Sequence, residues 1–190
     1  MSRGGAAGLL VVSALVLGAC SDGEAQAEPS TSPSLSVTAT QTPTVTSTEE
    51  IVPEPTMPPE AREQTAEGAA AFVRYWFDLV NYGYATGDTE PLELLSHPDC
   101  ATCKSIADQI NGRYGKGGRF DDGVISVGSA EATVPDERGA ALVTVGYKQE
   151  ALKELSRTGV VENSGTPEQG TLAVYVLSDG AWTVFGIADE

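Results

Sequence analysis

Cys100 and Cys103 are the residues whose types and spacing point most directly to chemistry. On the first turn of a helix, two cysteines at this spacing have Cα atoms roughly 5 Å apart, which lies within the range of a disulfide. We therefore expect a structural disulfide. A thioredoxin-like redox pair is the alternative, because a helix N-terminus favours the reactive thiolate. The pair does not follow a strand of a βαβ unit, and this argues for the structural role.

The single histidine, His97, precedes this pair and is the one conventional imidazole base in the chain. With Cys100 and Cys103 it offers three ligands that zinc accepts. Structural zinc sites usually combine two separated ligand doublets, and the sequence holds no second doublet. It also lacks the Walker, Gly-x-Ser-x-Gly and His-Glu-x-x-His patterns. We therefore expect no metal and no cofactor, and we assign no catalytic residue.

The N-terminus carries an export signal. Arg3 is followed by an apolar run from Ala6 to Ala19. One positive charge before a short hydrophobic stretch is the layout of a secretory signal peptide. The run is too short to span a bilayer comfortably, since a membrane helix needs about 20 residues. The sequence therefore predicts an exported protein.

The end of this run, Leu17-Gly18-Ala19-Cys20, resembles the lipobox of bacterial lipoproteins. The resemblance implies that residues 1–19 are a signal peptide and that Cys20 becomes the first residue and carries a diacylglycerol anchor. Two or more acyl chains hold a protein stably on a membrane, whereas one does not. We expect an extracytoplasmic protein that is lipid-anchored to the cell membrane. An ordinary signal peptide, cleaved after an Ala-x-Ala-like site, is the alternative.

Composition divides the rest of the chain into two parts. Residues 21–60 are rich in Ser, Thr, Pro and Glu and contain no aromatic residue. A segment of this kind cannot bury enough apolar surface to offset the entropy of ordering it. We therefore expect residues 20–60 to be the lipidated cysteine and a disordered linker. Residues 61–190 hold every Trp, Tyr and Phe and are predicted to form one domain.

The formal net charge of -16 excludes one class of partner. Nucleic-acid binding needs clustered Lys and Arg that displace counterions, so we expect no nucleic acid as a partner. Anionic lipid headgroups would also repel such a chain. Contact with the membrane is therefore expected through the lipid anchor and not through a basic face. An envelope protein and a small apolar ligand are the candidate partners.

The hydrophobic pattern of the domain changes from helical to strand-like near residue 120. Helices are predicted at 61–86, with Thr65 as N-cap if the helix starts late, at 91–96 and at 100–114. Strands are predicted at 124–134, 140–149, 171–177 and 182–187, and the last two are joined by an Asp179-Gly180 turn. Residues 156–170 are a loop or a hairpin end. Helices followed by antiparallel strands predict an α+β domain, with the helices packed on a curved sheet of about four strands.

Three segments also carry a resemblance: 71–82 (AFVRYWFDLVNY), 84–92 (YATGDTEPL) and 98–103 (PDCATC). They resemble an uncharacterised family of actinobacterial lipoproteins over most of residues 60–190. The order of elements is similar to the cone-shaped fold of nuclear transport factor 2 and ketosteroid isomerase. Proteins with this cone include enzymes, binding modules and passive domains, so the fold names no activity.

The cone implies a pocket between the first helix and the sheet. The pocket candidates are the polar and aromatic residues Tyr75, Asp78, Tyr82, Tyr175 and Trp182. An isomerase of the cone fold combines an Asp base with a Tyr donor in an apolar cavity. No Asp and Tyr of this chain can be assigned to matching positions. Core aromatics and a solvated Asp are the simpler interpretation of these residues.

These observations favour a non-catalytic binding or accessory module at the cell envelope, and whether the domain is an enzyme stays open. Two alternatives remain. One is an isomerase or lyase of small molecules that uses the cone pocket. The other is a thiol-redox accessory protein that uses Cys100 and Cys103.

Overall fold

The computed structural model describes residues 51–190. The predicted signal peptide, Cys20 and most of the predicted linker therefore lie outside the described residues. Within residues 51–190, no helix is both long enough and apolar enough to cross a bilayer.

The predicted α+β class is confirmed. The helical elements are η1 (Pro59–Arg62), α1 (Ala66–Thr86), α2 (Glu90–Leu94) and α3 (Ala101–Tyr114). The strands are β1 (Arg119–Asp121), β2 (Ile125–Ala132), β3 (Ala140–Gln149), β4 (Lys153–Leu155), β5 (Val161–Ser164), β6 (Glu168–Ser178) and β7 (Trp182–Asp189). Four strands form an antiparallel main sheet in the order β2-β3-β6-β7, as expected. A small sheet in the order β1-β4-β5 adds three short strands.

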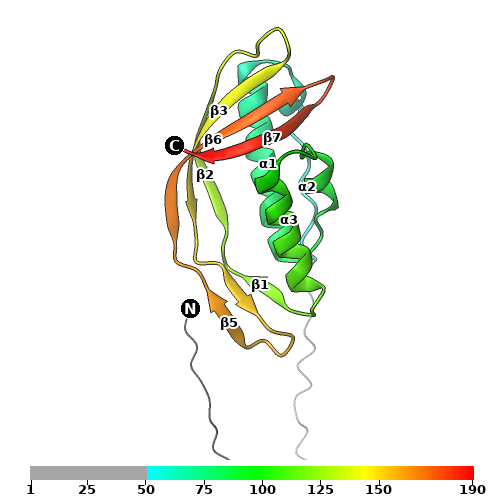
Figure 1. Cartoon of the computed structure of the whole chain (residues 1–190), viewed down its shortest axis with the longest axis vertical. Coiled ribbons are helices and arrows are strands. Elements are labelled where there is room, and N and C mark those ends of the chain that lie inside the picture. The colour runs from blue at the N-terminus through cyan, green and yellow to red at the C-terminus, as the bar shows by residue number, and fades with distance from the viewer. Residues whose placement is uncertain (1–50) are drawn as a thin grey trace, which may run out of the picture. The chain divides into compact units, whose positions relative to one another are not determined.

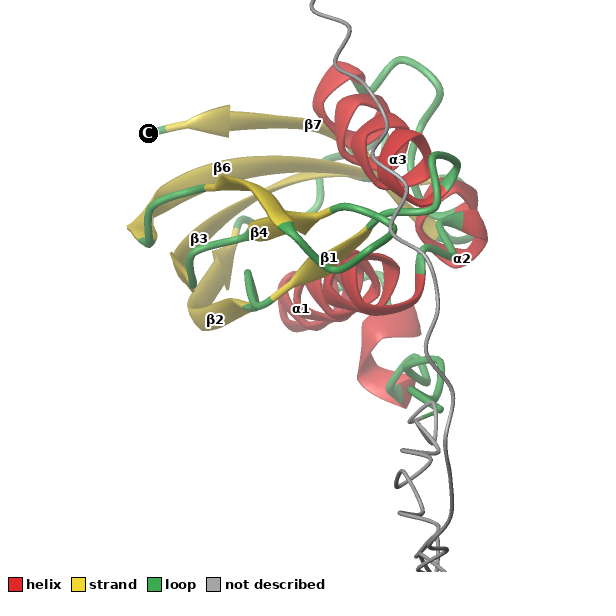
Figure 2. Ribbon diagram, turned by 90° about the horizontal axis from the view of Figure 1, so that it is seen from below, coloured by secondary structure: helices red, strands yellow, loops and turns green. Residues whose placement is uncertain are grey.

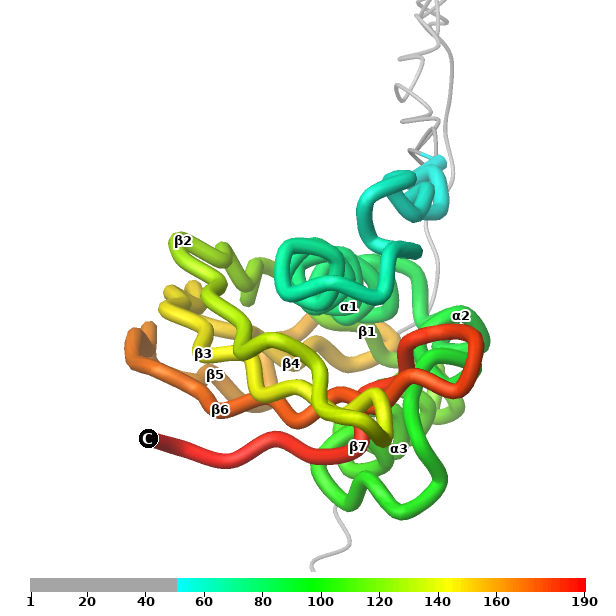
Figure 3. Tube along the Cα trace, turned by 90° about the horizontal axis from the view of Figure 1, so that it is seen from above, coloured from blue at the N-terminus to red at the C-terminus, as the bar shows by residue number. Residues whose placement is uncertain are grey.

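The helices stand on one side of the curved main sheet, and the small sheet closes the lower end of the domain in Figure 1. The views along the long axis show β1 between α1 and α3, with α1 beside β2 and α3 beside β7 (Figures 2 and 3). Inward-facing strand residues and the apolar face of α1 form one core. Its fully buried side chains include Phe72, Trp76, Val143, Val174 and Val184.

Local signals explain where α1 begins and ends. The Thr65 hydroxyl accepts a hydrogen bond from the Gly68 backbone N–H at 3.0 Å, so Thr65 is the N-cap. Gly87 ends the helix with φ at 81°, a left-handed conformation that glycine adopts without strain. The helix therefore starts after the predicted residue 61, and the segment before it forms the separate turn η1.

The main sheet follows the predicted strands closely. β3 pairs with β6 from Ala140 opposite Leu177 to Gln149 opposite Glu168. β6 returns to β7 through the predicted turn, in which Gly180 has φ at 81°. A parallel bridge from Ser96 to Val184 ties the connection between α2 and α3 to the start of β7. Residues 156–170 belong to the end of the hairpin that β3 and β6 form, which was one of the two alternatives, and they add β5, which pairs with β4.

Residues 51–58, the N-terminal arm, run alongside α1. The Tyr75 hydroxyl donates a hydrogen bond to the Pro55 carbonyl oxygen at 3.3 Å. Met57 packs against the core, and Ala61 is buried just beyond the arm. Residues 51–60, the described part of the predicted linker, therefore contact the folded domain.

Candidate functional site

The predicted disulfide between Cys100 and Cys103 is confirmed, with Cα atoms 5.3 Å apart. Cys100 is the N-cap of α3, and its sulfur accepts the Cys103 backbone N–H. Cys103 lies against the Val184 carbonyl of β7. The two cysteines are only 1% and 2% exposed. A redox partner needs access to the sulfur it attacks, so this burial argues for the structural role.

His97 lies on the connection between α2 and α3 and packs against β7. Its backbone N–H donates to the Val184 carbonyl at 2.8 Å, and its ring lies 4.9 Å from the ring of Phe185. Its Nδ1 is 3.7 Å from a carboxylate oxygen of Asp99. Because Cys100 and Cys103 are joined to each other, they supply no thiolates to a zinc ion beside His97.

The structure does not bring the five pocket candidates together. Tyr75 and Trp182 are buried, and the Trp182 indole N–H donates to the Glu63 carbonyl at 2.9 Å. The Tyr82 hydroxyl bonds to Asp88. Asp78 is exposed on α1, and Tyr175 is exposed on β6. The five residues share a chemical type, but tertiary packing separates them.

The titration of Asp78 and Tyr75 follows from their surroundings on α1. Partial desolvation raises the pKa of Asp78. Desolvation raises the pKa of Tyr75 as well, with a smaller contribution from the carboxylate of Glu54 on the N-terminal arm. Neither residue lines the cavity between the helices and the sheet. The shift of Tyr75 therefore reflects packing beneath the arm, and neither shift marks an acid–base pair in a pocket.

A pocket between the helices and the sheet is present, but none of the five predicted candidates lines it. It has a volume of about 270 Å³. Its lining comes from α1, α3 and the ends of four strands, and includes Phe77, Tyr84, Thr102, Ile106, Ile125, Tyr147, Gln149, Leu172, Ile187, Ala188 and Asp189. Of these, Asp189 is the one carboxylate, and it is exposed at the mouth. Burial raises the pKa of Tyr84, which keeps this phenol protonated.

A second hollow, the outer groove, lies on the face of the main sheet away from the helices. It measures about 400 Å³ and is lined by Arg138, Ala140, Ala141, Leu142, Tyr175, Val176, Leu177 and Phe185. Tyr175 is 48% exposed and Phe185 46% exposed. Two half-exposed aromatic rings beside aliphatic side chains form an apolar surface of the kind that binds partners.

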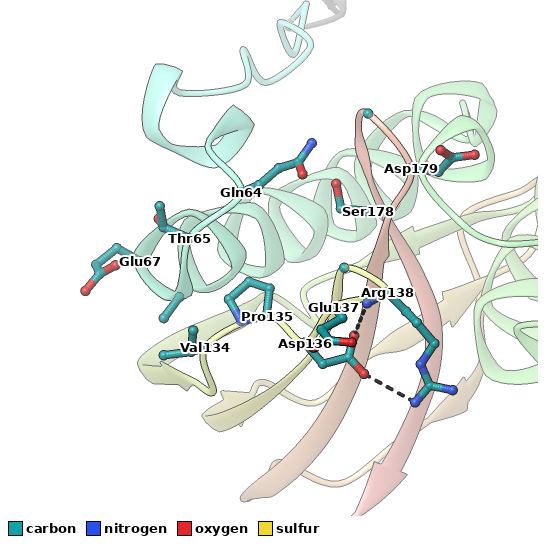
Figure 4. Close-up of a pocket in the computed structure, with 13 residues that line it drawn as sticks. Gln64, Thr65, Glu67, Val134, Pro135, Asp136, Glu137, Arg138, Ser178 and Asp179 are labelled. Atoms are coloured by element: carbon teal, nitrogen blue, oxygen red, sulfur yellow. Dashed lines mark hydrogen bonds and ion pairs between the residues drawn. The ribbon is translucent and has the colours of Figure 1, made fainter.

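A third hollow, the end pocket, adjoins the outer groove at Arg138, which lines both. It measures about 680 Å³ and lies between the start of α1 and the turns β2–β3 and β6–β7 (Figure 4). Asp136 accepts hydrogen bonds from the backbone N–H groups of Ala140 and Arg138, which lowers its pKa. The Ser178 hydroxyl is buried, and no side chain or backbone group of residues 51–190 pairs with it.

The outer groove was not foreseen from the sequence, although Tyr175 was singled out for another site. In β6, the run Val174-Tyr175-Val176 is apolar on both faces, so alternation does not reveal which side is buried. Phe185 is the extra residue at a register shift between β6 and β7, where Tyr175 pairs with Gly186 and Val176 with Val184. Without knowledge of this register shift, the sequence does not show that Phe185 and Tyr175 lie on the same face of the sheet.

Comparison with known proteins identifies a family, but the description of that family names no activity. The model of the Family of unknown function (DUF6318) matches residues 41–187. No curated protein matches the chain. Among solved structures, the "crystal structure of intermembrane space region of chloroplast protein ARC6" is similar, with a TM-score of 0.50 and 17% identity over 65% of this chain and 95% of that chain. At this identity the likeness concerns the fold alone.

Proposed function

We propose that this chain, which belongs to the Family of unknown function (DUF6318), is a lipid-anchored protein of the cell envelope whose domain is a non-catalytic binding module. The observation that carries the proposal is the outer groove. Tyr175 and Phe185 expose about half of their side chains there, on a molecule whose net charge is strongly negative. The partner is an envelope protein that offers a complementary apolar surface.

Two features support the location outside the cytoplasm. The first is the signal-like leader with Leu17-Gly18-Ala19-Cys20 at its end. The second is the Cys100–Cys103 disulfide, because disulfides persist in oxidising compartments and are rare in the cytosol. The two observations are independent, since one concerns the leader and the other the folded domain.

The outer groove supports a binding role through its chemistry. Burial of an aromatic ring contributes about 25 cal/mol for each Å² of apolar surface removed from water. Tyrosine and arginine are enriched at the centres of protein interfaces, and Tyr175 and Arg138 both line this groove.

A catalytic role has less support in the pocket between helices and sheet. Proton transfer by an enzyme of the ketosteroid isomerase type uses a carboxyl group held beside a Tyr in an apolar cavity. Here Asp78 lies outside the cavity, and Asp189 is open to solvent at its mouth. The exposed aromatic residues of the outer groove therefore favour a binding module over an isomerase or lyase.

The anchor is tested by fractionation of cells that produce the Cys20→Ala variant. We expect the parent protein to stay with washed membranes and the variant to be lost from them, because an unacylated chain has no stable hold on lipid. Mass spectrometry of the mature parent should find acyl chains on its first residue. A variant that remains as firmly bound as the parent would show that the anchor is wrongly assigned.

The groove is tested by a photo-crosslinking amino acid that replaces Tyr175 in the producing cells. We expect a protein adduct at this position and none at Gln109, an exposed position on α3. The Phe185→Ser substitution should remove most of the adduct, because it takes away half of the exposed aromatic surface. Equal adducts at both positions, or an adduct that Phe185→Ser leaves unchanged, would contradict the assignment.

A further inference from the structure

The cations of this acidic protein gather at one end of the domain. Residues 113–122 and 153–162 contain five of the ten cations that follow Cys20, together with four carboxylates. The other residues from 51 to 190 contain five cations and eighteen carboxylates. The two segments include the C-terminal end of α3, all of β1 and β4 and the first half of β5, which lie at the lower end of Figure 1. We call this end the basic tip.

Three of the five cations at the basic tip are free of ion pairs. Arg113 pairs with Glu154 and Glu162, and Lys153 pairs with Asp122. Lys116, Arg119 and Arg157 are exposed and form no ion pair with any of residues 51–190. Arg113 and Lys153 therefore offset two of the four carboxylates, and the three exposed free cations leave the basic tip with five positive and four negative charges.

The backbone turns hold these free cations close together. Arg157 extends over Gly117, where an added Cβ would lie 3.2 Å from the Arg157 Cδ. Arg119 extends toward the turn at Gly159, where an added Cβ would lie 3.9 Å from the Arg119 Nη1. Lys116 precedes Gly117 in the same turn. The aliphatic stem of Arg157 thus covers the turn at Gly117, and the guanidinium of Arg119 lies over the turn at Gly159.

The N-terminal arm enters the domain from the side of the basic tip. Trp182 binds the Glu63 carbonyl near the start of α1, and Tyr75, two to three turns further along the helix, binds Pro55. The arm therefore runs antiparallel to α1, and its first residues lie toward the C-terminal end of that helix, where Tyr84 packs against Phe120 of β1. Thirty residues, 21–50, separate Ile51 from Cys20, enough to span at most about 100 Å.

We propose that the basic tip binds the anionic headgroups of the membrane that holds the anchor, so that the domain stands with this end on the lipid surface. Each basic side chain near an anionic leaflet increases the partition coefficient of a protein onto the membrane about fivefold. The charge of the whole chain predicts no contact through a basic face, but that charge is unevenly distributed. The repelling carboxylates lie mostly on the rest of the domain, and the Debye length of about 8–10 Å at physiological salt screens them. The end pocket and the outer groove would then face away from the membrane. The proposal rests on the lipid anchor of the proposed function.

The test uses the lipidated full chain, purified from its own membranes and reconstituted into vesicles with a quencher on the lipid headgroups. One protein carries a fluorophore at Thr158→Cys in the basic tip, and a second carries it at Ala181→Cys at the opposite end. In phosphatidylglycerol vesicles we expect at least about twofold stronger quenching at position 158. The difference should disappear in phosphatidylcholine vesicles and at about 1 M salt, where the Debye length falls to about 3 Å.

Charge variants then identify the residues responsible. Lys116→Gln with Arg119→Gln should abolish the difference, whereas Arg62→Gln with Lys104→Gln, which removes the same charge elsewhere, should preserve it. Thermal unfolding of each pair confirms that the fold is intact. Equal losses in both pairs, or a difference that persists in phosphatidylcholine, would overturn the proposal, because net charge or the tether alone would then explain the orientation.

Two further controls distinguish binding of lipid headgroups from binding of a free anion, and failure of the basic tip from failure of the anchor. At equal ionic strength, inorganic phosphate and chloride should reduce the quenching difference to the same extent. A selective loss in phosphate would overturn the proposal in favour of a site for the free anion. A chain that fails to float with any vesicle overturns the anchor and this proposal with it. A chain that floats but is quenched equally at both positions overturns only the role of the basic tip.

Discussion

The two ends of this domain are closed by different kinds of interaction. At the end of the β2–β3 and β6–β7 turns, which we call the acidic end, the buried indole of Trp182 packs near Phe72 and binds the Glu63 carbonyl. At the basic tip, the guanidinium of Arg113 joins α3 to β4 and β5 through Glu154 and Glu162. An apolar closure depends on buried area, whereas an ionic one depends on charge and salt. The ends can therefore be probed separately.

The largest effect is expected from Trp182→Ala at the acidic end. Removing a fully buried indole costs about 3–5 kcal/mol of unfolding free energy, and this loss should not depend on salt. Trp182→Phe, which keeps a ring beside Phe72 but loses the hydrogen bond to Glu63, should cost about 1 kcal/mol. Urea unfolding measures both. A cost below about 1 kcal/mol for the alanine variant would mean that the indole does not close this end.

Arg113→Ala tests the ionic closure of the basic tip. The Arg113 side chain is 15% exposed and Glu154 22% exposed, so the pair lies between the exposed and the buried cases. We expect a loss of about 2–3 kcal/mol in unfolding free energy, because Glu154 is left without its cation. The loss should shrink in high salt, unlike that of Trp182→Ala. Arg113→Lys should recover part of it, and a salt-independent loss would indicate that packing dominates.

Removal of the disulfide should loosen α3 near the acidic end only. A bridge that closes so short a loop is worth about 2 kcal/mol by chain entropy, so Cys100→Ser with Cys103→Ser should lower the stability by about this amount. Hydrogen exchange should accelerate in the first turn of α3 and stay unchanged near Tyr114 at the other end of the helix. Reductant should destabilise the parent but not the double variant. Exchange that accelerates along the whole helix would mean that the two ends are not independent.

The smallest effect concerns Asp136 in the β2–β3 turn. Backbone N–H groups of Ala140 and Arg138 lower the pKa of this carboxyl below its ordinary 3.8. A carboxyl with a lowered pKa stabilises the fold above 3.8, and this contribution is lost as the pH falls through the folded-state pKa. Asp136→Ala should lower Tm by about 2 °C at neutral pH, and the difference should fade below 3.8. Asp136→Asn keeps one side-chain oxygen that can accept these hydrogen bonds, so its Tm should depend less on pH. A Tm difference between the parent and Asp136→Ala that stays the same in acid would contradict an origin in the carboxylate charge.

The sequence predicted the elements of the domain better than its surface. Thr65 as N-cap, the end of the first helix at residue 86 and the turn at Asp179-Gly180 follow from local signals, and each was confirmed. Strand β5, with the sequence Val161-Glu-Asn-Ser164, was not predicted because all four residues are exposed and carry no apolar alternation. β1 and β4 were missed because three residues are too few to show a period.

The candidate sites were harder to predict, because they combine residues from distant segments. Tyr75, Asp78 and Tyr82 lie on one helix, yet one is buried under the N-terminal arm, one is exposed and one bonds to Asp88. The pocket between helices and sheet contains strand-end residues such as Gln149 and Asp189, which have no distinctive motif. Only their meeting in space gives them a common role.

The sequence by itself determined the α+β class, the main-sheet strands and the Cys100–Cys103 bridge. These depend on residues near one another in the chain, where hydrophobic period, capping and cysteine spacing act directly. Only the tertiary structure decided that Lys116, Arg119 and Arg157 meet at one end and that Tyr175 and Phe185 share an open face. Periodicity specifies which residues are buried, whereas long-range packing decides which exposed residues become neighbours.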